Sequence, residues 1–117
     1  MAAVNVSSNT ALTTLLLSNT AIESLDVTKN TNLETLNLSS CTSVTEIDLS
    51  QNTKLKTLNL NSTKVTAIDC SAMTTLESLT CGSAALETIN ISKTRVRELA
   101  LHLYTHRLNA VHHFLKY

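Results

Sequence analysis

The chain has 117 residues, and its nine Lys and Arg residues balance nine Asp and Glu residues, so the net charge is zero at neutral pH. That length allows one domain, and the charge balance provides no basic surface for nucleic acid or anionic lipid. Aromatic residues make up 3% of the sequence, and with one glycine and no proline the glycine-dependent phosphate loops and nucleophile elbows are absent. The composition therefore argues against nucleic-acid binding, a deep small-molecule or cofactor site, and several classes of enzyme.

The first ten residues, MAAVNVSSNT, lack the basic segment and apolar run of a secretory leader, and no stretch is long enough to span a bilayer. Two alternatives follow for localisation. The protein is intracellular, or a leader precedes the sequence given.

A short phrase of the form apolar, two residues, apolar, one residue, apolar recurs along most of the chain. Every apolar slot of its nine copies holds Leu, Ile, Val or Cys, and the copies begin at Leu12, Ile22, Leu33, Val44, Leu55, Val65, Leu76, Leu86 and Val96. Because the last two apolar positions alternate, each copy is predicted to be a short strand with an inward-turning lead residue.

The copies alternate between two types. In the Asp-type phrases, which begin at Ile22, Val44, Val65 and Leu86, the residue before the last apolar position is Asp26, Asp48, Asp69 or Asn90. The intervening copies, here called Asn-type phrases, include Asn37 and Asn59 at that position. One Asn-type and one Asp-type phrase make a unit of 20 to 22 residues, which cannot bury its own apolar side and must stack on its neighbours. A solenoid is predicted, with two strands in each coil.

The segments LETLNLSSCTSV and LKTLNLNSTKV resemble the LxxLxLxxNxL segment of the leucine-rich repeat family. Cys41 and Thr63 stand in the family's Asn slot, while Asn30 and Asn52 occupy it in the other phrase. The two-phrase unit is similar to the short repeats of bacterial internalin-like and Bacteroides surface proteins, over roughly residues 4 to 101. The resemblance implies about four and a half coils over residues 1–101, a protein-binding function, and an extracellular or cell-surface location. Thr20, Met73, Ala84 and Thr94 replace the slot Asn, so the family's buried hydrogen-bond ladder is expected to be interrupted, and no capping segment precedes the first coil.

Two sets of outward positions are candidates for function. By family resemblance the Asn-type strands present the protein-binding surface, which is predicted to comprise Thr14, Leu16, Thr35, Asn37, Thr57, Asn59, Asn61 and Thr80. The alternative is a solvated sheet of residues with good β propensity. A neighbouring column, Thr13, Glu34, Lys56, Glu77 and Arg97, alternates in charge and would mark the register of the coils.

The Asp-type strands place Asp26, Asp48 and Asp69 one strand spacing apart. A hard cation such as calcium would relieve their repulsion. We expect instead that each carboxylate accepts hydrogen bonds from the residue two positions on, in turns of the form DxS or DxT.

The three cysteines fall in buried positions of the repeat. Cys70 and Cys81 fill inward apolar slots, and we expect all three thiols to be free and to behave as small apolar residues. Burial would make such a thiol inert, which argues against a nucleophile paired with a histidine of the tail. No catalytic residue is predicted, and the chain is not expected to be an enzyme.

Residues 102–117 depart from the repeat and are predicted to form an amphipathic helix that caps or associates with the last coil. Residues 96–101 fit either a strand or the start of this helix. His102 and His106 have the spacing of a zinc or nickel pair, although solvated helix histidines are the alternative.

Two functions are compatible with these observations. The first is a non-enzymatic protein-binding or adhesion module. The second is a structural or engineered scaffold that self-associates through its uncapped ends or its C-terminal helix, for instance as a homodimer. No cofactor is implied by either.

Overall fold

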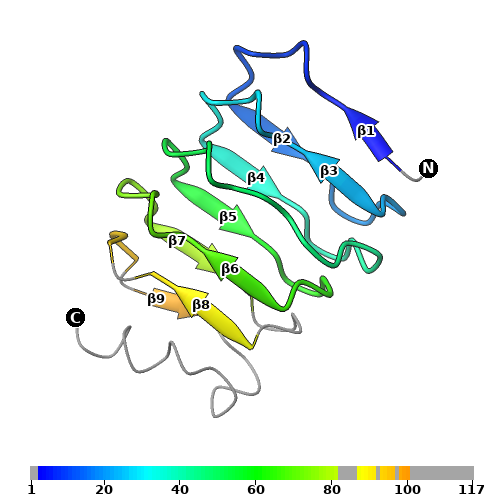
Figure 1. Ribbon diagram of the computed structural model, residues 1–117. Helices are drawn as coiled ribbons and strands as arrows, with labels where there is room; N and C mark the ends of the chain where they lie inside the picture. Colours follow the sequence, from blue (N-terminus) through cyan, green and yellow to red (C-terminus); the bar gives the residue numbers. More distant parts are fainter. Residues whose placement is uncertain (1–2, 82–86, 92, 97, 101–117) are drawn as a thin grey trace.

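The computed structural model describes residues 3–81, 87–91, 93–96 and 98–100. They form nine strands of three residues each, arranged as two rows along a staircase of stacked coils (Figure 1). The strands are β1 (Ala3–Asn5), β2 (Thr14–Leu16), β3 (Ser24–Asp26), β4 (Thr35–Asn37), β5 (Thr57–Asn59), β6 (Ala67–Asp69), β7 (Ser78–Thr80), β8 (Thr88–Asn90) and β9 (Glu98–Ala100). This is a β-solenoid of about four turns, which confirms the predicted stacking.

The Asn-type phrases form a continuous five-stranded parallel sheet in the order β2-β4-β5-β7-β9. Its register aligns equivalent residues of successive coils, as in the pairs Leu36↔Leu58 and Leu58↔Leu79. Backbone hydrogen bonds continue past the strand ends into the turns, for example from Ser40 N to Asn61 O at 2.8 Å. The predicted register is confirmed for this sheet, and residues 98–100 of the ambiguous segment form strand β9.

The strands of the second row, which are β1 and those of the Asp-type phrases, form two separate pairs, β1-β3 and β6-β8, rather than one sheet. Between β3 and β6, residues 46–48 run alongside without strand pairing, so the predicted strand in the phrase at Val44 is wrong (Figure 1). The N-terminal strand β1, which lies before the first of the nine phrases, was not predicted. It pairs with β3 and shows that the repeat begins earlier than the apolar pattern indicates.

The register explains why the second row is interrupted at residues 46–48. Each junction that pairs places a carboxylate beside a neutral amide: Asn5 lies opposite Asp26, and Asp69 lies opposite Asn90. Pairing of residues 46–48 would instead place Asp48 between Asp26 and Asp69. Like charges directly opposite each other destabilise a strand pair. The interruption therefore coincides with the junctions where carboxylate would face carboxylate.

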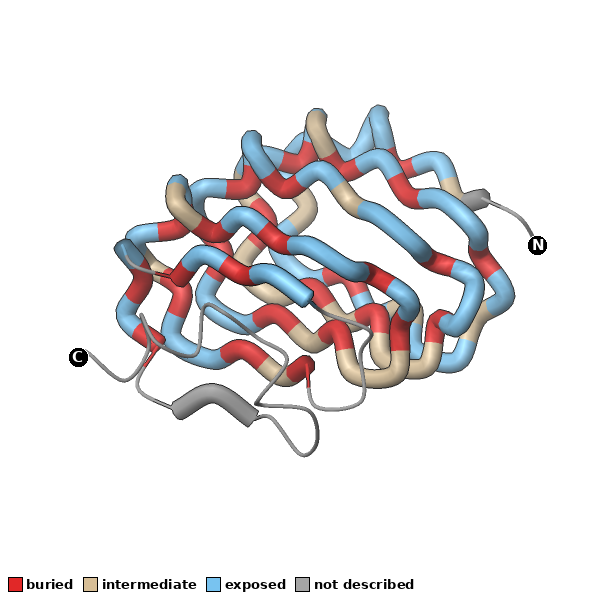
Figure 2. Tube along the Cα trace, turned by 60° about the horizontal axis from the view of Figure 1, so that its bottom comes forward, coloured by how far each residue is buried: buried red, intermediate tan, exposed pale blue. Residues whose placement is uncertain are grey.

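The core lies between the two rows, and buried and exposed residues alternate along each coil (Figure 2). The central inward residues of the Asn-type strands, Leu36 and Leu58, are 0% exposed, whereas Leu15 in the first coil is 9% exposed. Each fully buried leucine contributes roughly 1.5–3 kcal/mol relative to an exposed one. An interior coil is therefore stabilised by a neighbour on each side, whereas the first coil leaves its inward residues less covered.

Two buried asparagines connect successive coils through their side chains. Asn30 Nδ2 donates to Val6 O and Asn9 O at 3.0 and 2.9 Å, and Asn52 Nδ2 donates to Val27 O and Asn30 O at 3.1 and 3.0 Å. On the opposite side Cys41 Sγ lies 3.0 Å from Leu17 O, in the corresponding cross-coil position. These contacts tie the first three coils together.

The ladder is interrupted in the later coils, as the sequence predicts. Thr63 Oγ1 and Thr94 Oγ1 donate to Leu60 O and Ile91 O, which belong to their own coils. Met73 is fully buried and has no polar group with which to continue the Asn52 ladder. Beyond the third coil the described coils are therefore joined by strand pairing, by the bond from Thr75 Oγ1 to Leu55 O at 2.9 Å and by apolar packing, without the buried asparagine ladder.

The predicted helix at 102–117, including the His102 and His106 pair, lies outside the described residues. Within the described ranges all regular structure is strand, and no helix of a length and apolarity suited to crossing a membrane is found there.

The ladder can be tested with two asparagines of different burial. We expect Asn52→Ala to lower the free energy of unfolding by about 1–2 kcal/mol, because two buried hydrogen bonds are lost while Asn52 Oδ1, which has no partner in the described part of the chain, is also removed. The matched control is Asn32→Ala, because Asn32 Nδ2 also reaches across coils, to Thr10 O at 3.2 Å, in an exposed position. Its cost should be within about 0.5 kcal/mol. Chemical denaturation measures both, and equal losses would contradict a structural role specific to the buried ladder.

Candidate functional site

The predicted protein-binding residues lie on one outward surface, the free side of the sheet formed by β2, β4, β5 and β7. The register aligns Thr14, Thr35, Thr57 and Ser78 in one column and Leu16, Asn37, Asn59 and Thr80 in the next. We call these two columns, together with Asn61, the hydroxyl–amide face. The structure thus brings the predicted residues together, and whether they bind a partner stays a prediction.

Leu16 is the most apolar feature of this face, because its side chain is 61% exposed. It lies on β2, the first strand of the sheet, and in the column that elsewhere carries Asn or Thr. A single exposed apolar residue surrounded by hydroxyl and amide groups resembles the mixed chemistry of protein-binding surfaces.

Asn37 and Asn59 also have a structural role that the sequence reasoning did not assign. Asn37 Oδ1 accepts a hydrogen bond from Ser39 N, and Asn59 Oδ1 accepts one from Asn61 N, both at 2.9 Å. Each side chain therefore caps the turn that follows its strand. Substitution of either residue would change stability as well as the outward surface, so the threonines are the better positions at which to test binding.

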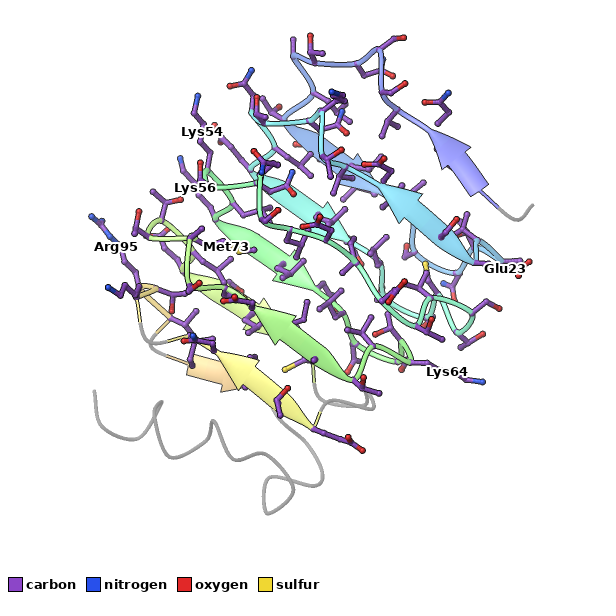
Figure 3. The ribbon with its side chains drawn as sticks, in the orientation of Figure 1. Glu23, Lys54, Lys56, Lys64, Met73 and Arg95 are labelled. Carbon is purple, nitrogen blue, oxygen red and sulfur yellow. The ribbon has the colours of Figure 1, made fainter. Side chains whose placement is uncertain are left out.

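A second edge of the molecule carries the charged register column. Lys56 Nζ lies 3.7 Å from Glu34 Oε1 in the preceding coil, as the alternating column predicts. Both side chains are about half exposed, so the pair adds at most a few tenths of a kcal/mol. Figure 3 shows Lys54, Lys56 and Arg95 along this edge, with Glu23 and Lys64 on the opposite side of the molecule.

Each carboxylate of the Asp column accepts a hydrogen bond within a turn of the predicted DxS or DxT form. Asp26 Oδ1, Asp48 Oδ1 and Asp69 Oδ1 accept hydrogen bonds from the backbone N–H two residues on, each at 2.9 Å. The Thr28 hydroxyl also donates to Asp26 Oδ1 at 2.6 Å. Among the described residues no group of three or more Asp, Glu, His or Cys side chains is arranged to hold a metal ion.

These turns change the acidity of the carboxyls. Hydrogen bonds from the Thr28 side chain and backbone hold the pKa of Asp26 below its ordinary value of 3.8. The corresponding bonds from Ser50 and Ser71 lower the pKa of Asp48 and Asp69. The charge of Asp26 acts in the opposite direction on the pKa of Asp48, which indicates that the two carboxylates influence each other across the unpaired junction.

The feature that sequence reasoning missed is the opening beside residues 46–48. A groove of about 420 Å³ lies between this segment and β3, and its lining includes Leu25, Asp26, Glu46, Ile47 and Asp48. A second groove of about 250 Å³ lies on the other side, between the segment and β6. We call residues 46–48 and these two grooves the acidic seam. The signal available in the sequence is the column of Asp26, Asp48 and Asp69, because like charges on neighbouring strands oppose pairing as well as favouring a cation.

The cysteines are buried and free, as predicted. Burial raises the pKa of Cys70 and of Cys81 to about 12. Such thiols are protonated at neutral pH and are poor nucleophiles.

Comparison with known proteins identifies the class of fold. At a TM-score of 0.81 and 28% sequence identity, the chain is similar to the functional domain of InlJ from Listeria monocytogenes, which includes a cysteine ladder. The similarity covers 85% of this chain and 22% of that domain, so this chain spans about a fifth of its length. The β-solenoid of this chain is therefore similar in fold to the internalins, which are leucine-rich repeat proteins.

A second structure, the internalin InlF from Listeria monocytogenes strain 4b F2365, has 18% identity and a TM-score of 0.33 over 76% of this chain and 44% of that one. A similarity at that level carries no further argument. No protein-family profile and no curated protein sequence matches the chain.

The Asp turns predict how stability depends on pH. The pKa values of Asp26, Asp48 and Asp69 are lower in the folded protein than in the unfolded chain. Their contribution to the free energy of unfolding is therefore present above the unfolded-state pKa of about 4, and it is lost as pH falls through the folded-state pKa values. Urea denaturation between pH 5 and pH 2 should therefore show falling stability. In the triple variant Asp26→Asn, Asp48→Asn, Asp69→Asn the fall should be smaller, because the amide oxygen still accepts the turn hydrogen bond but does not titrate. An unchanged slope in that variant would show that other carboxyls carry the acid sensitivity.

Proposed function

We propose that the protein is a non-enzymatic protein-binding or adhesion module that acts at the cell surface through the hydroxyl–amide face. The observation that carries the proposal is the continuous five-stranded sheet, which presents Thr14, Thr35, Thr57 and their neighbours on one surface in register. The similarity to internalin-type repeats supports a surface protein-binding module.

The chemistry of this face suits a protein partner better than a small molecule. Short hydroxyl and amide side chains lose little conformational entropy on binding and donate and accept hydrogen bonds in several directions. Leu16 supplies an apolar contact at one end. The buried, protonated thiols of Cys70 and Cys81 support a role in packing rather than in catalysis.

A second candidate is self-association through the N-terminal coil. Val6 and Leu15 there are 8% and 9% exposed, while their equivalents in the next coil, Val27 and Leu36, are 0% exposed. Within the described residues β2 pairs on one edge only, with β4, so its other edge is free to pair with another chain. The exposed Leu16 lies at this edge.

Binding through the hydroxyl–amide face can be tested by introducing two positively charged residues on that face. Thr14 and Thr57 are exposed and lie on strands separated by β4, so Thr14→Lys with Thr57→Lys should leave stability within about 0.5 kcal/mol. We expect this variant to lose at least tenfold in affinity for any partner that wild-type protein captures from intact cells or matrix, measured by surface plasmon resonance.

The matched control adds the same two charges on the other row, as Thr66→Lys with Thr88→Lys, where both threonines are exposed. It should retain wild-type affinity. Retained affinity in the Thr14 and Thr57 variant, or equal losses in both variants, would count against the hydroxyl–amide face.

Self-association is tested separately by sedimentation velocity over a hundredfold range of concentration. If the N-terminal edge mediates it, the sedimentation coefficient should rise with concentration, and Leu16→Lys should abolish the rise while Thr57→Lys leaves it in place. A concentration-independent monomer would remove this candidate without affecting the first.

A further inference from the structure

We propose that the acidic seam is a second binding surface, which accommodates an extended segment of a partner protein that carries Lys or Arg side chains. This surface is on the row opposite the hydroxyl–amide face, so the proposal is independent of the proposed function.

The first observation is that the seam has unpaired backbone. Within residues 3–81, which are described without a gap, the backbone groups of residues 46–48 make no hydrogen bond to β3 or β6. On the hydroxyl–amide side the same coils are joined by strand pairing and by additional turn bonds such as Leu38 N to Asn59 O at 2.8 Å. Backbone groups without a hydrogen-bond partner in the protein can pair with the backbone of another extended segment.

The second observation is that the seam makes an inward apolar residue accessible. Ile47 is partly exposed and lines both grooves, whereas its equivalents in the neighbouring coils, Leu25 and Ile68, are 7% and 5% exposed. Together with Leu25, Ile47 gives the groove beside β3 an apolar floor. The seam therefore combines apolar and acidic groups, whereas a purely solvated acidic surface would have no accessible apolar residue at its base.

The third observation is the sign of the charge around that floor. Asp26, Glu46 and Asp48 line the groove beside β3, Asp48 and Asp69 line the groove beside β6, and neither lining includes a basic residue. The charge of Lys29 acts on Asp26, but Lys29 is in the following turn rather than in the groove lining. Figure 3 shows the other labelled cations, Lys54, Lys56, Lys64 and Arg95, at the edges of the molecule.

A lysine or arginine side chain has an aliphatic stem and a charged head, which are complementary to the apolar floor and to the carboxylates of the seam. Its aliphatic stem would cover Leu25 and Ile47, while its charged head would reach Asp26 and Asp48, because such side chains commonly bury the stem and keep the head in a polar environment. The bound cation would also offset the repulsion between the two carboxylates. An extended segment fits better than a free amino acid, because its backbone can also pair with the unpaired groups of residues 46–48.

The test uses a fluorescent peptide of alternating Lys and Thr and measures its binding by anisotropy. We expect Asp26→Asn with Asp48→Asn to weaken binding at least tenfold. Asn is suited to both sites because Asn5, Asn37 and Asn59 already accept the equivalent turn hydrogen bond in this chain. The variant therefore removes charge without removing the turn.

The control variant Glu34→Gln with Glu77→Gln removes the same number of negative charges from the other edge, and it should bind within twofold of wild type. A peptide with acetylated lysines, which keeps the stem but not the charge, should not bind. Wild-type protein that fails to bind the Lys peptide would overturn the proposal, as would equal weakening by the two variants, which indicates nonspecific attraction.

Hydrogen exchange locates the contact. The Lys peptide should slow exchange of the amides in residues 24–26 and 46–48 and leave those of β4 and β5 unchanged. Protection of the same amides by calcium alone, with no effect of the peptide, would assign the seam to a divalent cation and overturn the proposal.

Discussion

Every coil of this protein depends on its neighbours to cover the apolar residues that it turns inward. A unit of 20 to 22 residues with three-residue strands is too small to enclose its own core, and parallel stacking in register is the arrangement that covers each inward leucine with the equivalent residues of the next coil. The increase in exposure from Leu36 to Leu15 shows what happens where one neighbour is missing. The same requirement fixes the positions of all outward residues, because a shift of one residue would exchange the two faces of a strand.

Stacking in register places residues of the same type side by side, and the consequence depends on their charge. Columns of Thr and Asn are neutral, so the Asn-type row pairs without interruption across five strands. The Asp column behaves differently, since Asp26 and Asp69 pair only with coils that offer Asn5 or Asn90. One constraint therefore produces two unlike surfaces on a single solenoid: a regular hydroxyl–amide face and an interrupted acidic row with an accessible apolar floor.

The polar slot at each turn shows a similar dependence on the side chain. Asn is long enough to reach the carbonyls of the preceding coil, as Asn30 and Asn52 do, while the shorter Thr63 and Thr94 bond within their own coils. Cys41 reaches Leu17 O and the Thr20 hydroxyl, at 3.0 and 3.3 Å, and so replaces an asparagine with a weaker donor. The early coils are consequently joined by this buried side-chain ladder as well as by strand pairing and packing, whereas the later ones are joined by strand pairing, by the Thr75 hydroxyl and by packing around residues such as Met73.

The sequence alone determined the solenoid, the alternation of two phrase types, the inward residues, the free buried thiols and the Asp turns, because each of these follows from a local pattern repeated many times. It did not determine which neighbouring phrases pair, because pairing depends on what lies opposite across a coil. Only the tertiary structure decided that β1 pairs with β3, that residues 46–48 remain unpaired, and that grooves open beside Ile47. The periodicity of the sequence determines whether a side chain points inward or outward. Whether two neighbouring phrases pair depends on the charges of residues about 21 positions apart, such as Asn5 and Asp26, which the fold places side by side.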